Sequence, residues 1–352
     1  MIGKNEEHSF GVITSNGVKP IEEVNIGDKV YEYKTSKLLE VRGIQCESAP
    51  VDVVVYSDGR SGMYLRNSLI FNGYAVVNLC DIYEGRISKK ANIIQYPIEF
   101  NANKVVIPLD PSPYLAGALL MYSDHTKEEI SVPLYLNTTY EMIVNMMNDA
   151  NGLFTKNHLS DPIYPTVNFI YKGDLTETAV TWKDLFHGYK FDATTDTSDR
   201  IFPIEYERAS IKDRLKFLRG IFDMGYIRNV FPDGVVGIVG NDSKALVEVQ
   251  KILCSVGILS RIKYDSFLSQ MRGISYKLEL MGDHLVHPDL FHDVYHIMDT
   301  IKDETKALYP TTPNFVDIMF TKNISENGYM YNLILDKPAI YMDSNYLPRV
   351  SK

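Results

Sequence analysis

The chain has 352 residues and a formal net charge of −9 at pH 7. This length predicts two or three domains rather than one. No run reaches the roughly 18 apolar residues that cross a bilayer, and the first ten residues lack the apolar core of a secretory signal. We therefore expect a cytoplasmic protein without a membrane partner. The acidic total lowers the expectation of duplex-DNA binding, because DNA-binding proteins usually carry a basic face.

The cysteines are few and widely separated along the chain. Cys46, Cys80 and Cys254 are odd in number and show no zinc-type pairing. Such usage is typical of reduced thiols rather than of a disulfide framework.

Residues 1–107 have the pattern of a β-rich segment. Strands are predicted at Val53–Tyr56 and Tyr74–Leu79. Four turn signals separate the short apolar runs: Asn16-Gly17, Gly27-Asp28, Asp58-Gly59 and Asn72-Gly73.

Residues 108–308 contain two similar α/β units, at about 108–205 and 206–308. In the first, Ser112 and Pro113 suit the start of a helix that runs to Tyr122. In the second, the capping box Ser210-x-x-Asp213 precedes a helix that ends at Met224. The recurrence of one element order after roughly 100 residues indicates an internal repeat.

Residues 309–352 return to β character. Strands are predicted at Phe315–Phe320, Tyr329–Leu335 and Ala339–Met342. The order β, α/β pair, β favours an insertion, in which the two β pieces form one discontinuous domain and the middle is a guest.

Two segments at opposite ends of the chain resemble inteins. Gly17–Tyr31 (GVKPIEEVNIGDKVY) is similar to the N-terminal intein signature, and Tyr329–Met342 is similar to the last intein strands. The resemblance implies an all-β protein-splicing (Hint) module.

The two helices of the repeat resemble the paired helices of LAGLIDADG homing endonucleases. They are Tyr114–Tyr122 (YLAGALLMY) and Phe217–Tyr226 (FLRGIFDMGY). Together the two resemblances imply an α+β chain, in which a Hint-like module is interrupted by a pseudo-two-fold αββαββ LAGLIDADG-like domain.

The groups that the intein resemblance implies for splicing are missing. Counting back from Gly17 places the first intein residue near Asn5, which has no thiol or hydroxyl nucleophile. Asn67 falls where a histidine is expected. No His-Asn pair closes the C-terminal segment. We therefore expect no splicing.

The carboxylates that the LAGLIDADG resemblance implies for DNA cleavage are also missing. They belong five residues after each helix glycine, where this chain has Tyr122 and Gly225. Asp124 and Asp223 are the fallback acids, each displaced by two residues, which turns a helix by about 200°. We expect no cofactor, and Mg²⁺ only if these acids make the chain an active endonuclease.

The same resemblance places the helix interface at small residues. Ala116, Gly117 and Gly220 suit a close approach, but Met121 and Met224 stand four residues after the glycines. Two flexible methionines at equivalent positions predict a looser, repacked crossing.

A histidine cluster is the other candidate site. It comprises His284, His287, His292 and His296. Pro288 interrupts the run and no cysteine joins it, so solvated or capping roles are favoured over a metal site.

The leading hypothesis is a domesticated relative of inteins that neither splices nor cleaves. It would act as a binding or structural protein, encoded by a phage and located in the host cytoplasm or the virion. A protein partner or a larger assembly is favoured. The alternatives are a free-standing LAGLIDADG endonuclease that cuts double-stranded DNA, and a DNA-binding regulator that does not cut.

Overall fold

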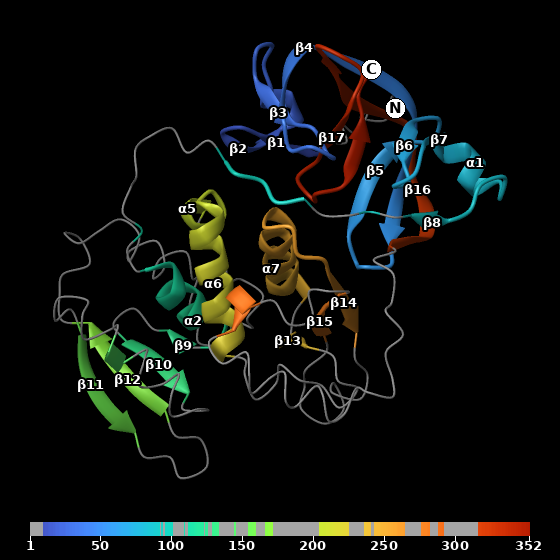
Figure 1. Cartoon of the computed structure of the whole chain (residues 1–352). Helices are drawn as coiled ribbons and strands as arrows, with labels where there is room; N and C mark the ends of the chain where they lie inside the picture. The colour runs from blue at the N-terminus through green and yellow to red at the C-terminus, as the bar shows by residue number, and fades with distance from the viewer. Residues whose placement is uncertain are drawn as a thin grey trace, which may run out of the picture. The chain divides into compact units, whose positions relative to one another are not determined.

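A computed structural model gives the structure of the protein, which mixes helices with antiparallel sheets (Figure 1). It describes residues 10–91, 93, 96–100, 109, 112–122, 124–125, 129–133, 144–145, 154–159, 166–171, 204–224, 236–240, 243–264, 276–281, 288–291 and 316–352. The chain divides into two units. The first comprises Met1–Lys104, Leu253–Arg261 and Thr311–Lys352, and the second comprises Val105–Ile252 and Ile262–Pro310.

A seven-stranded antiparallel sheet organises the first unit. Its order is β2-β1-β3-β4-β16-β8, and β5 also pairs with β4. The strands are β1 (Gly11–Thr14), β2 (Gly17–Pro20), β3 (Lys29–Tyr31), β4 (Leu38–Tyr56), β5 (Ser61–Leu65), β8 (Lys90–Ala91) and β16 (Val316–Leu335). The 3-10 turn η1 (Ile21–Glu23) follows β2.

The pairing of β4 with β16 joins the two ends of the chain (Figure 1). It runs antiparallel from Ile318 opposite Tyr56 to Leu335 opposite Val41. The prediction of two separate strands at 315–320 and 329–335 was wrong, because β16 continues through residues 321–328. Shifts in the pairing register between β4 and β16 accommodate the polar residues of this segment.

A four-stranded sheet completes the first unit. Its order is β17-β18-β6-β7. The strands are β6 (Leu69–Phe71), β7 (Val76–Asn78), β17 (Ile340–Met342) and β18 (Pro348–Val350), and the short helix α1 (Leu79–Tyr83) follows β7. Isolated bridges from Val12 to Asp343 and from Glu32 to Tyr341 link β17 and the turn after it to the larger sheet.

Buried aliphatic side chains from both ends of the chain fill one core of this unit. They include Val12, Val30, Val41, Leu333 and Leu335. Burial of this kind stabilises by about 25 cal/mol per Å² of apolar surface. The sheet therefore depends on residues more than 290 positions apart.

The turns of the first unit follow the glycine signals. All four predicted turn glycines have a positive φ, which residues with a Cβ rarely adopt: Gly17, Gly27, Gly59 and Gly73.

The second unit combines helices with two smaller antiparallel sheets. Their orders are β11-β12-β10-β9 and β13-β15-β14. The strands are β9 (Asp124–His125), β10 (Glu129–Pro133), β11 (Phe154–Leu159), β12 (Thr166–Tyr171), β13 (Gly237–Gly240), β14 (Ser260–Tyr264) and β15 (Tyr276–Leu280). The helices are α2 (Pro113–Tyr122), α5 (Ile204–Glu207), α6 (Ile211–Met224), α7 (Ser243–Ser255) and the 3-10 turn η5 (Pro288–Leu290). The border between the units falls within α7 and β14.

The start of α6 shows the predicted interaction between Ser210 and Asp213. The Ser210 hydroxyl accepts from the Asp213 backbone N–H at 3.2 Å and donates to its carboxylate at 2.8 Å. This arrangement satisfies one of the backbone donors that every helix start leaves free.

The crossing of α2 and α6 is as close as backbones allow. A Cβ added to Gly117 would overlap the carbonyl oxygen of Phe217, and one added to Gly220 would overlap that of Tyr114. Each glycine thus meets the residue three positions before the other. The prediction of a looser crossing from Met121 and Met224 was wrong, because the contact runs through the two glycines.

The contact pattern is reciprocal, as a two-fold axis between the helices requires. Gly117 also faces the backbone nitrogen of Ile221, and Gly220 faces that of Ala118, each one position after the partner glycine. This symmetry agrees with the internal repeat in the sequence. Within the described helices, none is long and apolar enough to cross a membrane.

Substitution of Gly117 by alanine should destabilise the second unit. The added methyl has no space against the Phe217 backbone, so the helices must separate at a cost of at least about 2 kcal/mol. Gly43→Ala is the control, because the nearest atom to its added Cβ is a side-chain carbon of Ile334 at 3.4 Å. Hydrogen-exchange mass spectrometry should show lost protection in α2 and α6 for Gly117→Ala only. Equal protection in both variants would contradict the close crossing.

Glu207 should make the stability of the second unit depend on pH. Burial and the nearby charge of Glu248 raise the pKa of Glu207 to about 7. A raised carboxyl pKa favours the protonated folded state, so stability falls as pH rises from about 4.5 to about 7. Glu207→Gln removes this loss.

The Glu207→Gln variant should therefore be more stable than the parent by about 1–2 kcal/mol at pH 8, allowing for partial exposure, and should differ little at pH 4. Urea unfolding at the two pH values measures the difference. A gain of the same size at both would exclude the carboxyl as its source.

Candidate functional site

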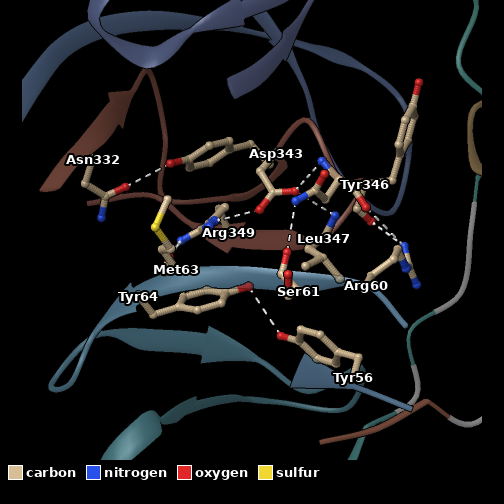
Figure 2. Close-up of polar contacts among 12 residues, drawn as sticks. Tyr56, Arg60, Ser61, Met63, Tyr64, Asn332, Asp343, Tyr346, Leu347 and Arg349 are labelled. Carbon is tan, nitrogen blue, oxygen red and sulfur yellow. Dashed lines mark hydrogen bonds and ion pairs between the residues drawn. The ribbon is translucent and has the colours of Figure 1, made fainter. Parts of the chain in front are cut away.

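The turn between β17 and β18 is built around the Asp343 carboxylate (Figure 2). Its Oδ1 accepts from the backbone N–H groups of Asn345 at 2.9 Å and Leu347 at 3.0 Å. Its Oδ2 accepts from Nε of Arg349 at 3.0 Å. Tyr346 adopts a φ of 57° within the turn. One buried carboxylate thus holds a strained turn in a single shape.

The same turn is fastened to β5, a strand from the other end of the chain. Asn345 donates through Nδ2 to the carbonyl of Ser61 at 2.9 Å. Arg349 donates through Nη1 to the carbonyl of Met63. These bonds bring together residues almost 290 positions apart (Figure 2).

A second buried ion pair supports the turn from the other side. Arg60 and Asp58 approach to 2.6 Å, and both side chains are almost fully buried. Arg60 also donates through Nη1 to the carbonyl of Tyr346 at 3.1 Å. Removal of one partner from such a pair costs far more than a surface ion pair, because a buried charge is left uncompensated.

The Arg349 guanidinium lies against two aromatic rings. Its central carbon is 4.1 Å from the ring centre of Phe10 and 3.9 Å from that of Tyr64. Burial by itself would lower the pKa of this guanidinium, but Tyr64 and Asp343 raise it overall. Arg349 is therefore a permanent cation held in a fixed orientation.

The neighbouring tyrosine hydroxyls are protonated hydrogen-bonding groups. The hydroxyls of Tyr56 and Tyr64 are 3.3 Å apart, and Tyr341 donates to Oδ1 of Asn332 at 3.1 Å (Figure 2). Burial raises the pKa of all three tyrosines. None of them is poised as a nucleophile, because that requires a lowered pKa or an adjacent base.

A cavity of about 540 Å³ opens beside this network, within the first unit. Its wall includes Phe10, Tyr64, Asn67, Arg349, Ser351 and Lys352. The start of β1, the turn after β5 and the segment after β18 therefore meet around one space.

The cavity contains one of the residues expected to have replaced a splicing group. Asn67 is exposed in the turn after β5, and its Oδ1 lies 3.0 Å from the Cys80 sulfur, whose S–H donates to it. Asn5, the expected first position, lies outside the described residues. The structure thus places Asn67 in the wall of the same cavity as Ser351, from which the sequence separates it by 284 residues.

In the helix pair, the Asp223 carboxylate is buried and engaged internally. It is 4% exposed, and the Tyr114 hydroxyl donates to its Oδ2 at 3.0 Å. Burial and the charge of Asp223 raise the pKa of Tyr114, so the hydroxyl keeps its proton. Asp124 begins β9, but its side chain lies outside the described residues.

The other predicted positions are distributed as follows. Ala116 and Met224 are buried at the helix pair. Met121 and Tyr122 end α2, with side chains outside the described residues. Gly225 and the four histidines of the predicted cluster, His284, His287, His292 and His296, also lie outside them. Where side chains are described, no group of three or more His, Cys, Asp or Glu residues is arranged to hold a metal ion.

Sequence reasoning missed the polar network itself. Asp58 was noted only as part of a turn signal, and neither Asp343 nor Arg349 was singled out. The one local signal was Asp343 two residues before Asn345, which is the spacing of an Asx turn. The contacts to β5 had no signal in the sequence, because they depend on the pairing of distant strands.

Comparison with known proteins gives only distant likenesses. No protein-family model and no curated protein matches the chain. Among solved structures, a mesophilic variant of the homing endonuclease I-DmoI matches with 14% identity and a TM-score of 0.33, over 56% of this chain and 97% of that one. Full-length WhiA from Thermatoga maritima matches with 13% identity and a TM-score of 0.34, over 58% and 65%. The gp41-1 intein matches with 18% identity and a TM-score of 0.21, over 27% and 70%.

Loss of the Asp343 charge should destabilise the first unit strongly. Asp343→Asn leaves Arg349 buried without its counter-ion, at a cost of about 3–5 kcal/mol. Arg86→Met is the control, because Arg86 forms only exposed ion pairs with Asp81 and Glu84 and should change stability by less than about 1 kcal/mol. Chemical denaturation of both variants gives the comparison. Similar midpoints for the two would show that the Asp343 pair does not hold the turn.

Proposed function

We propose that this protein is a relative of inteins that neither splices nor cleaves DNA, and that it binds a protein partner as a structural or scaffolding component. The first unit would correspond to the Hint-like module and the second to the LAGLIDADG-like domain. The observations that carry the proposal are that the fallback acid Asp223 is buried and accepts from the Tyr114 hydroxyl, and that Asn67 lines the cavity of the first unit where a histidine was expected.

The cavity of the first unit supports the loss of splicing. An acyl shift needs an activated thiol or hydroxyl beside a proton-transferring group. At the position expected for a histidine the cavity wall has the neutral amide of Asn67, and it also contains the permanent cation of Arg349 and the hydroxyl of Tyr64, whose pKa is raised. Within the described wall, none of these three groups can take up a proton near neutral pH.

The helix pair supports the loss of cleavage. A divalent ion at such a pair needs two carboxylates that converge on solvent. Asp223 is buried and receives the Tyr114 hydroxyl, so metal binding would require it to break that bond. A converging second acid would have to come from Asp124.

The sheet β13-β15-β14 offers little free positive charge for a phosphate backbone. Lys263 and Lys277 lie 3.1 and 3.0 Å from the carboxylate of Glu279. Glu279 is fully buried, so its single negative charge offsets part of the positive charge of the two lysines. These two lysines favour a protein partner over DNA.

Incubation of the protein with supercoiled DNA that carries its own coding locus, in Mg²⁺ or Mn²⁺, tests the absence of cleavage. We expect no specific cuts, and no salt-sensitive gel shift. Fusion of reporter domains at both ends of the chain tests splicing, and we expect no ligated product.

Two matched variants define the result that would contradict the absence of cleavage. Specific cuts that disappear in Asp223→Asn but persist in Asp213→Asn, an acid near the exposed start of the same helix, would establish the endonuclease and overturn the proposal.

A further inference from the structure

Arg349 presents one nitrogen that the protein itself does not use. The residue is 6% exposed, and its Nε and Nη1 donate to Asp343 and to the carbonyl of Met63. Nη2 has no hydrogen-bond partner among the described residues, although Arg349 lines the cavity. A guanidinium nitrogen with two free N–H bonds, on a residue that lines a cavity, can donate charge-assisted hydrogen bonds to a ligand.

The guanidinium is fixed before any ligand arrives. Phe10 and Tyr64 contact it, while Asp343 holds its edge. Binding therefore pays little side-chain entropy, which favours affinity. Asp343 leaves Nη2 of Arg349 available as a donor. The two carboxylate oxygens already accept hydrogen bonds from two backbone N–H groups and from Nε.

The other residues of the cavity wall indicate the chemistry of the part of the ligand that Arg349 does not contact. Leu65, Leu69 and Met330 provide apolar wall, and Lys352 adds a second cation, which is paired with Glu47. The volume of about 540 Å³ is in the range that holds small molecules or a peptide end.

We propose that this cavity binds a carboxylate attached to an apolar group, with Nη2 of Arg349 as the recognising donor. The carboxylate comes either from a free small acid or from the C-terminal residue of a peptide. The inference rests on the proposed binding role of the first unit, but its readout is separate, since ligand affinity is measured independently of DNA cleavage and splicing.

Calorimetric titration of the full chain with N-acetyl-phenylalanine and with its neutral amide tests the proposal. The acid should bind about tenfold more tightly than the amide, because only the carboxylate forms charge-assisted bonds with Arg349. Equal affinity for acid and amide, or no saturable binding of the acid up to about 10 mM, would overturn it.

Two substitutions of opposite charge at one exposed position of the cavity wall provide a test that does not depend on a change in folding. Leu69 is 51% exposed and lines the cavity, so Leu69→Glu and Leu69→Lys should both fold. The Leu69→Glu variant should bind the acid at least about threefold more weakly than the Leu69→Lys variant, while the neutral amide should bind the two variants equally. Identical acid affinities in the two variants would place the ligand elsewhere and reject the site.

The affinity for a peptide distinguishes the two possible sources of the carboxylate. Gly-Gly-Phe with a free C-terminus should bind more tightly than N-acetyl-phenylalanine if the natural ligand is a chain end, and more weakly if it is a free acid. Either order sustains the carboxylate site, provided that amidation of the peptide abolishes its binding.

Discussion

The Asp343 carboxylate imposes the constraint on which the first unit depends. It closes the β17–β18 turn through two backbone donors and orients Arg349 through a third bond. Arg349 then reaches β5 and the ring of Phe10, so the strands from both chain ends are held in one arrangement. A buried charge pair of this kind contributes less to net stability than to uniqueness, since alternatives would leave a charge unpaired in the core.

In the second unit, too, a buried carboxylate is bonded within the protein. Gly117 and Gly220 bring α2 and α6 into backbone contact, which places Tyr114 against Asp223. The Tyr114 hydroxyl then donates to this buried carboxylate. In both units, a buried acid thus serves to fix packing. This is the physical basis for proposing a protein that binds rather than one that catalyses.

Local sequence rules anticipated much of the fold. Helices were expected near α2 and α6, and strands near β7 and β17, within a few residues of their observed bounds. The turn glycines and the Ser210 cap followed from short-range conformational preferences. The prediction of a loose helix crossing was wrong, because it gave more weight to Met121 and Met224 than to the glycines, through which the two backbones meet. The continuity of β16 was missed, because bulges accommodate polar residues that resemble a turn.

The sequence by itself determined most of the element types and the internal repeat, because these depend on residue identity and spacing. The loss of catalytic groups at Asn67, Tyr122 and Gly225 is a prediction of the same kind. Tertiary structure alone decided that Arg349 lies between Phe10 and Tyr64 and faces a cavity. These residues are up to 339 positions apart, and no periodicity links them. Their contact exists only because β4 pairs with β16 and the β17–β18 turn folds back onto β5.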